Sequence, residues 1–483
     1  MSPARARLAT ILAASLALAG CGAADSGPVE VSAIGGPPRL GDANRGPLDA
    51  PSAFLTEAVA QGLVRFNAEG DIEPALAQSW IISDDGLTYT FRLRRTNWIE
   101  GGRVTAQEVA ARLRLALARN SRNPLKPVLG AVEEIVAMTD EVIVINLRGP
   151  RPNFLQLLAH PEMALLRRGA GTGPYRVVAV DDGVSRLRLI GGEDEEAPVE
   201  GPDVLLRGEP ALEAVARFAE DRRALVVGGT AADLPLVRAA DLPNGVLRFD
   251  PVSGLFGLSF NPRGGPLISA ALRQALAMAI DRQAIATALG VPNLAPRTSI
   301  VPPGVQELPN VAQPDWANLT QAQRRTEAQR LIAELAPPEP IRLRVAMPDG
   351  PGYRLIFAHL RRDWRLIGIE AERVAPGRPA DLIFIDAVAP ANLASWYLRH
   401  FTCDASGVCD PAADTAIQAA RLAPDAAERQ RQFALADGIL TRATPFIPLT
   451  APVRWSLVPG RLDGFQPSPF ARHPAVNLIA ERP

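Results

Sequence analysis

Hydrophobic and polar residues alternate with a period of two in several stretches of this chain. Between residues 87 and 93, the apolar side chains Leu87, Tyr89, Phe91 and Leu93 occupy every second position. This period predicts a strand with one buried face. Residues 80–83 have the same character, and the Asp-Asp-Gly sequence between the two stretches is typical of a turn. We therefore predict a β-hairpin here.

Other stretches have the three-to-four-residue spacing of an amphipathic helix. Thr105 and Glu108 have the spacing of a capping box at the start of a predicted helix over 106–119. Residues 268–290 also have helical spacing, and Asp281 is placed to cap a second helix within them. These segments predict helices with defined starting points.

Beyond residue 340, predicted strands and helices alternate. The strands are 341–347, 369–374 and 381–388, and the helices are 353–368, 411–422 and 424–442. Alternation of this kind predicts an α/β fold with a largely parallel sheet covered by helices.

The N-terminus has the pattern of an export signal. Arg5 and Arg7 precede the apolar run 8–19, which is too short to span a bilayer. The sequence Leu-Ala-Gly-Cys ending at Cys21 resembles a bacterial lipobox, in which the cysteine receives lipid. An ordinary signal peptide with a chance cysteine is the alternative. We predict a signal over 1–20, followed by a flexible tether over 21–30.

Composition limits the possible functions of the chain. Its 483 residues are enough for two or three subdomains, and 47% of them are hydrophobic. The net charge of −1 becomes −3 once residues 1–20 are removed, and no basic stripe is present. This balance argues against nucleic-acid binding. No later segment is apolar enough to span a membrane, so membrane attachment is predicted through the N-terminal lipid alone.

Two cysteines remain if Cys21 carries lipid. Cys403 and Cys409 are close in sequence, and an exported chain meets an oxidising compartment, so we predict a disulfide between them. Half of a zinc site is the alternative, but this spacing is unusual for zinc and His400 is the nearest histidine. We predict no metal and no cofactor.

Several motifs together resemble one protein family. The long run over 57–109 contains EGDIEPALAQSW, DGLTYTFRLR and WIEGGRVTAQEV. TGPY follows at 172–175, FN with RQALAMAIDR at 260–282, and AER with PFIPL at 427–449. These motifs resemble the solute-binding proteins of peptide-type ABC importers, the dipeptide- and oligopeptide-binding proteins. The loop around Cys403 and Cys409 is similar to a disulfide-bearing loop of that family.

The resemblance implies a two-lobed periplasmic-binding-protein-like fold of type II. In residue order, it implies a first lobe starting at 31–47, an extra small subdomain at 48–165, the first lobe continued at 166–261, a second lobe at 262–440 and a return to the first lobe at 441–483. Such a protein closes its cleft by hinge motion.

The resemblance also implies a site for the amine of a peptide. Asp386 and Pro390 have the family spacing of an amine-binding aspartate and a following proline, after a predicted strand. The chain departs from the family at Ile383, where a tryptophan is usual. The loop before residue 354, which often supplies a ligand contact in the family, is also short, so the resemblance assigns no arginine to the carboxylate of the peptide. Arg354 is the nearest candidate for that role. Trp396 is a candidate lining residue, although aromatics beside an apolar run more often belong to the core.

The implied function is binding without chemistry. We expect an exported, lipid-anchored monomer in the periplasm that passes a peptide or related small solute to ABC permease subunits. A non-peptide solute, or a sensor or scaffold independent of transport, is the alternative. A hydrolase is disfavoured, because none of the four histidines lies in a recognisable motif and Ser259 lacks the closing glycine of a nucleophile elbow.

Overall fold

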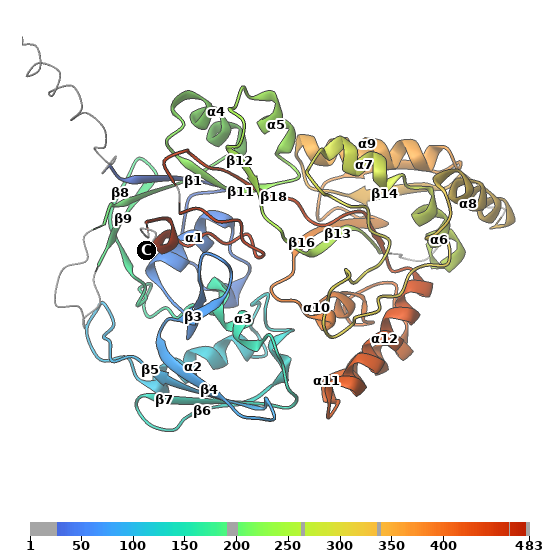
Figure 1. Ribbon diagram of the computed structural model, residues 1–483. Helices are drawn as coiled ribbons and strands as arrows, with labels where there is room; N and C mark the ends of the chain where they lie inside the picture. The colour runs from blue at the N-terminus through green and yellow to red at the C-terminus, as the bar shows by residue number, and fades with distance from the viewer. Residues whose placement is uncertain (1–26, 191–200, 262–265, 336–339, 463, 480–483) are drawn as a thin grey trace, which may run out of the picture.

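The computed structural model describes residues 27–190, 201–261, 266–335, 340–462 and 464–479. The predicted signal and Cys21 lie outside these residues. Within the described part, no helix is both long and apolar enough to cross a membrane. The chain forms two lobes, each built on a mixed sheet, and Figure 1 shows them side by side.

The first lobe is built on a seven-stranded sheet. Its strand order is β12 (Leu247–Phe249), β18 (Arg454–Leu457), β11 (Leu225–Thr230), β1 (Val29–Ile34), β10 (Val204–Glu209), β9 (Val184–Leu189) and β8 (Tyr175–Asp181). Strand β1 runs parallel to β10 and β11, and the other pairs are antiparallel. Helices α1 (Ala50–Val59), α4 (Ala211–Asp221), α5 (Leu234–Ala239) and α13 (Ala475–Ile479) belong to this lobe (Figure 1).

The second lobe is built on a five-stranded sheet. Its order is β15 (Glu370–Val374), β14 (Arg342–Ala346), β16 (Leu382–Val388), β13 (Gly254–Phe260) and β17 (Phe446–Pro448). Helices α6 (Ala270–Ala279), α7 (Arg282–Leu289), α8 (Gln321–Leu335) and α9 (Pro351–Arg365) accompany it. Asp281 caps α7 as predicted, because its carboxylate accepts the Ala284 N–H at 3.0 Å.

The three strands for which the alternation predicts a parallel sheet are parallel, because β14 pairs in parallel with both β15 and β16. The sheet as a whole is mixed, because β13 runs antiparallel to both β16 and β17. These two antiparallel strands adjoin the passages between the lobes, because the chain enters this sheet from the first lobe through residues 250–253 and leaves it through 449–453.

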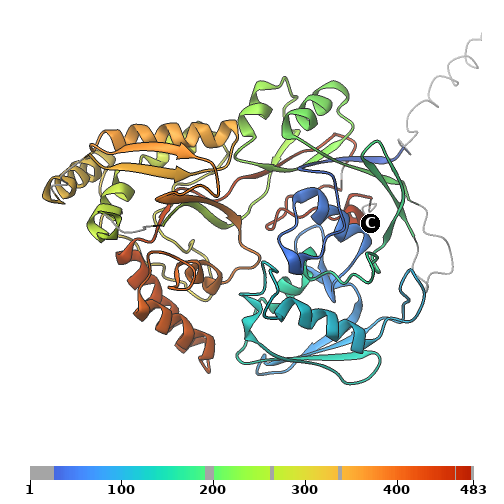
Figure 2. The ribbon, with the colours of Figure 1, turned by 180° about the vertical axis from the view of Figure 1, so that it is seen from behind.

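A four-stranded antiparallel sheet forms a smaller unit, here called the hairpin subdomain. It contains β4 (Ala77–Ile82), β5 (Thr88–Leu93), β7 (Val142–Leu147) and β6 (Val132–Ala137), with helices α2 (Ala106–Leu117) and α3 (Phe154–Ala159). The predicted hairpin is confirmed, and Tyr89, Phe91 and Leu93 are buried. Thr105 caps α2 by accepting the Glu108 N–H. Figure 2 shows α2 beside this sheet from behind. A two-stranded ribbon of β2 (Val64–Phe66) and β3 (Ile72–Pro74) lies next to α3.

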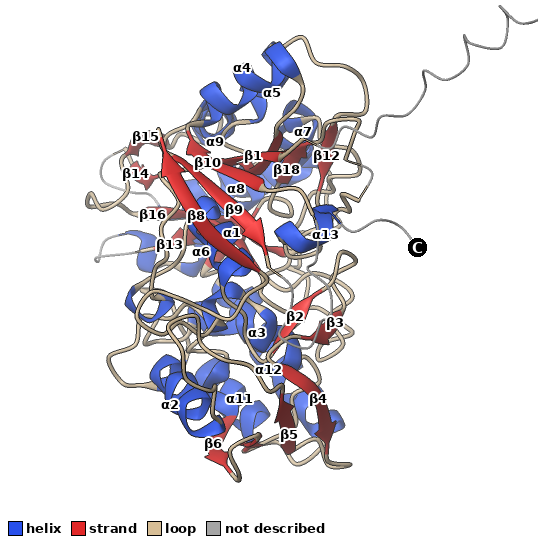
Figure 3. Cartoon of the chain, turned by 90° about the vertical axis from the view of Figure 1, so that its left-hand side faces the viewer, coloured by secondary structure: helices blue, strands red, loops and turns tan. Residues whose placement is uncertain are grey.

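The hairpin subdomain and the second lobe share hydrophobic packing. Helices α10 (Ala394–Leu398), α11 (Pro411–Leu422) and α12 (Ala426–Ala443) belong to the second lobe, and Figure 3 shows α11 and α12 at the same end of the molecule as β4, β5 and β6. Phe91 and Phe154 of the subdomain lie in one buried cluster with Phe401 and Phe433. The hairpin subdomain and the second lobe are therefore in contact, and the boundary between them is here called the seam.

The predicted disulfide is confirmed. Cys403 and Cys409 are joined in the segment that precedes α11.

Because the Cys403–Cys409 bridge closes a short loop, its loss gives the unfolded chain only a small gain in conformational entropy. Reduction is therefore expected to lower the free energy of unfolding by about 2 kcal/mol. Urea unfolding with and without a reductant measures this value. The Cys403→Ser, Cys409→Ser double variant should match the reduced protein, and an unchanged midpoint would contradict the expectation.

Candidate functional site

Asp386 lies where the two lobes meet. It sits on β16 of the second lobe, and Arg454 opens β18 of the first. The Arg454 Nη1 atom donates to Asp386 Oδ1 at 2.7 Å, and the Tyr353 hydroxyl donates to Asp386 Oδ2 at 2.7 Å. The side chains of Asp386 and Arg454 are only 7% and 16% exposed. This buried ion pair therefore links the two lobes.

A second carboxylate belongs to the same junction. Asp233 immediately precedes α5, and its Oδ2 accepts a hydrogen bond from the Thr230 hydroxyl at 3.1 Å. The Trp455 indole N–H donates a hydrogen bond to the Thr230 carbonyl oxygen at 2.8 Å. Burial raises the pKa of Asp233, and the negative charge of Asp386 raises it further. The junction thus brings two carboxylates near each other, of which Asp386 is paired with Arg454.

Tyr353 completes this arrangement from the first turn of α9. Burial raises the pKa of its phenol, and the neighbouring charge of Asp386 acts in the same direction. The hydroxyl therefore stays protonated at neutral pH and acts as a donor to the carboxylate. Since the ionised carboxylate offers about four lone-pair sites, two donors do not exhaust its capacity.

The backbones of the two lobes also touch at this junction. The Gly352 N–H donates to the Ala232 carbonyl at 2.8 Å, which joins the start of α9 to the loop after β11. A Cβ atom at Gly352 would lie 1.8 Å from the Ala231 carbonyl oxygen. Only glycine permits this close approach without a shift of the backbone.

The other residues suggested by the sequence lie elsewhere. Arg354 pairs with Asp349 at 2.7 Å, and both side chains are more than half exposed. Trp396 is buried in α10, where it packs edge-to-face against Tyr397 and His400. The partners of Asp386 described above are Arg454 and Tyr353, and solute contact by Arg354 or Trp396 stays a prediction. Sequence reasoning missed Arg454, Asp233 and Tyr353, which no motif marks and which only the tertiary fold brings together.

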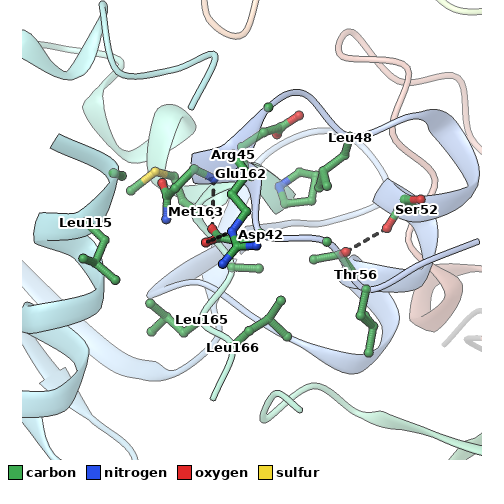
Figure 4. A pocket seen from close by; sticks show the side chains of 18 of the residues that line it. Asp42, Arg45, Leu48, Ser52, Thr56, Leu115, Glu162, Met163, Leu165 and Leu166 are labelled. Atoms are coloured by element: carbon green, nitrogen blue, oxygen red, sulfur yellow. Dashed lines mark hydrogen bonds and ion pairs between the residues drawn. The ribbon is translucent and has the colours of Figure 1, made fainter. Parts of the chain in front are cut away.

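The first lobe and the hairpin subdomain line a separate open cavity of about 950 Å³. Figure 4 shows Leu115 of α2 on one side and Ser52 and Thr56 of α1 on another, with Asp42 and Arg45 between them. All of its lining residues lie within 39–169, so this cavity is not formed between the lobes. Among the described residues, no group of His, Cys, Asp or Glu is arranged to hold a metal ion.

Comparison with known proteins gives consistent matches. The family model described as "Bacterial extracellular solute-binding proteins, family 5 Middle" matches residues 71–376. The dipeptide-binding protein of Pseudomonas aeruginosa is 24% identical over 87% of this chain and 89% of its own length. The glutathione-binding protein GsiB of Escherichia coli is 28% identical over 54% of each chain.

Solved structures show the same two-lobed fold. Haemophilus influenzae OppA in complex with RPPGFSPFR aligns with a TM-score of 0.79 at 19% identity, covering 93% of this chain and 98% of that one. AgaA from A. tumefaciens in complex with agropinic acid aligns with a TM-score of 0.71 at 18% identity, covering 94% and 99%.

Proposed function

Because the chain belongs to the bacterial extracellular solute-binding proteins of family 5, we propose that it captures a peptide or a related small solute between its lobes and delivers it to ABC permease subunits. Its relatives are named for binding, which supports a role without catalysis. The proposal includes export to the periplasm, a lipid on Cys21, a monomeric state and the predicted division into subdomains.

We propose Asp386 as the residue that binds the amine of the solute. The observation that carries this is the presence of two carboxylates at the junction, where Asp386 is buried and paired with Arg454, and where burial and the charge of Asp386 raise the pKa of the neighbouring Asp233. A buried ammonium group needs such a partner, since an unpaired charge out of water is costly. An ammonium can bind beside Arg454 or replace it on the carboxylate.

The pair between Arg454 and Asp386 also favours the second candidate, a solute without a free amine. Asp386 already has a cationic partner within the protein. A neighbouring fold with agropinic acid bound supports the idea that solutes of this architecture need not be peptides. N-acetylation of the solute separates the two candidates, because it removes the charge and leaves the backbone.

The test is a binding screen of the purified full-length chain against di- to pentapeptides, their N-acetylated forms and other small solutes. A solute at a hundred times its Kd should add about 2.7 kcal/mol to the free energy of unfolding. For an amine-bearing solute, Asp386→Asn should weaken binding at least tenfold. Asp84→Asn, in the exposed hairpin turn, is the matched control and should leave Kd unchanged. Equal affinity of wild type and Asp386→Asn would reject the amine assignment.

A further inference from the structure

Two buried arginines lie at the seam between the hairpin subdomain and the second lobe, one on each side, and the charge of Arg429 acts on Arg151. Arg151 follows β7 in the subdomain and is 5% exposed, and Arg429 lies on α12 and is 4% exposed. Glu307, on the second-lobe side, is 6% exposed. Fully buried arginines are rare unless their charge is paired.

The guanidinium groups of these arginines are incompletely satisfied. Arg151 Nη1 and Arg429 Nε and Nη2 are buried atoms without a hydrogen-bond acceptor. Glu307 does not fill this role, because its Oε2 accepts the Ala394 N–H at 3.1 Å and its Oε1 has no donor. On folding, these buried N–H groups lose their hydrogen bonds to water without gaining a protein acceptor, which is energetically unfavourable.

The charge around the seam is also unbalanced. The charged groups that act on Arg151 are Glu307, Arg429 and Arg421, so one carboxylate faces three arginines. Arg421 comes from α11 and donates to the Gly130 carbonyl of the subdomain at 3.1 Å, which places it on the same seam. Burial lowers the pKa of Arg151, and the charges of Arg429 and Arg421 lower it further. An additional negative charge would relieve both the repulsion and the missing acceptors.

We propose that Arg151 and Arg429 form a binding site for an oxyanion at the seam between the hairpin subdomain and the second lobe. An oxyanion supplies several acceptor oxygens, and guanidinium groups bind such groups through paired N–H donors. Its source is a carboxylate of the captured solute, which rests on the proposed function, or a free inorganic oxyanion, which does not. In either case the ion binds both sides of the seam and stabilises the contact between them.

The test measures binding of inorganic phosphate and of acetate to the full-length chain by calorimetry, at constant ionic strength. We expect Arg429→Gln and Arg151→Gln each to raise the Kd at least tenfold. Arg431→Gln, an exposed position on the same helix, should change it less than twofold. Absence of oxyanion binding to the wild type, or equal weakening by all three variants, would overturn the proposal.

Stability measurements distinguish an oxyanion-binding role of Arg429 from a purely structural one. Without added oxyanion, Arg429→Gln should be at least as stable as wild type, because it removes an uncompensated buried charge. Added phosphate should raise the Tm of the wild type and leave that of the variant unchanged. A variant that is less stable than wild type in both conditions would identify Arg429 as a packing residue and reject the site.

A solute identified in the peptide screen distinguishes the two sources. If its carboxylate occupies the seam, the solute displaces phosphate, and the amidated solute binds without doing so. If phosphate and solute bind independently, the oxyanion is inorganic. Phosphate binding with no solute found would sustain this site while removing support for peptide capture, so the two proposals fail separately.

Discussion

Replacing Arg454 by methionine is expected to destabilise the protein by about 3 kcal/mol. The change leaves the Asp386 carboxylate, 7% exposed, without its cationic partner and near the second negative charge of Asp233. Removing one member of a buried ion pair typically costs about 3–5 kcal/mol, because the other charge stays buried and unpaired. Urea unfolding of the variant and the wild type measures the difference.

Two comparisons make the Arg454 result specific. Adding Asp386→Asn to Arg454→Met should recover part of the lost stability, since it removes the unpaired charge. Arg342→Met breaks an exposed ion pair with Glu370 and should cost less than about 1 kcal/mol. A loss for Arg454→Met no greater than that for Arg342→Met would show that the junction pair is not buried in solution.

The second large effect is expected at Gly352. In Gly352→Ala the new Cβ would lie 1.8 Å from the Ala231 carbonyl oxygen, so the start of α9 must move away from the loop after β11. Because the obstructing atom belongs to the backbone and cannot rotate aside, we expect a cost of about 3 kcal/mol, the upper end for overpacking. The junction around Asp386 opens at the same time.

Small-angle scattering should therefore show a larger radius of gyration for Gly352→Ala than for the wild type. Gly438→Ala is the matched control, since that glycine lies within α12 and its nearest neighbour to a new Cβ is 3.7 Å away. Alanine there should raise stability by up to about 1 kcal/mol through its helix propensity. Unchanged scattering and stability for Gly352→Ala would mean that the lobes do not touch at this point in solution.

Local features of this protein could be predicted from its sequence. The alternation over 87–93, the cap at Thr105 and the cap at Asp281 depend on neighbouring residues only, and the structure confirms them. The disulfide closes a loop between nearby cysteines, so it could be predicted from the sequence in the same way. In each case the chemistry and the geometry belong to one short segment.

The junction itself could be predicted only in part. Asp386 was identified through a family motif, but its partner Arg454 is 68 residues away and lies in a different sheet. Whether two such residues meet depends on how β16 and β18 are brought together, which no local pattern encodes. Strand direction in the second lobe agrees with the alternation for β14, β15 and β16, whereas the antiparallel strands β13 and β17 are not among the strands that it predicts.

The chain passes between the lobes at 250–253 and again at 449–453, and each passage contains a proline, Pro251 and Pro452. Because two segments connect the lobes, the lobes can rotate relative to each other about the line through both segments. Twisting or sliding of one lobe against the other would strain both segments. The proline in each connecting segment fixes φ at its own position and makes the segment stiffer. A single backbone cut in either passage should therefore release new directions of movement without separating the halves.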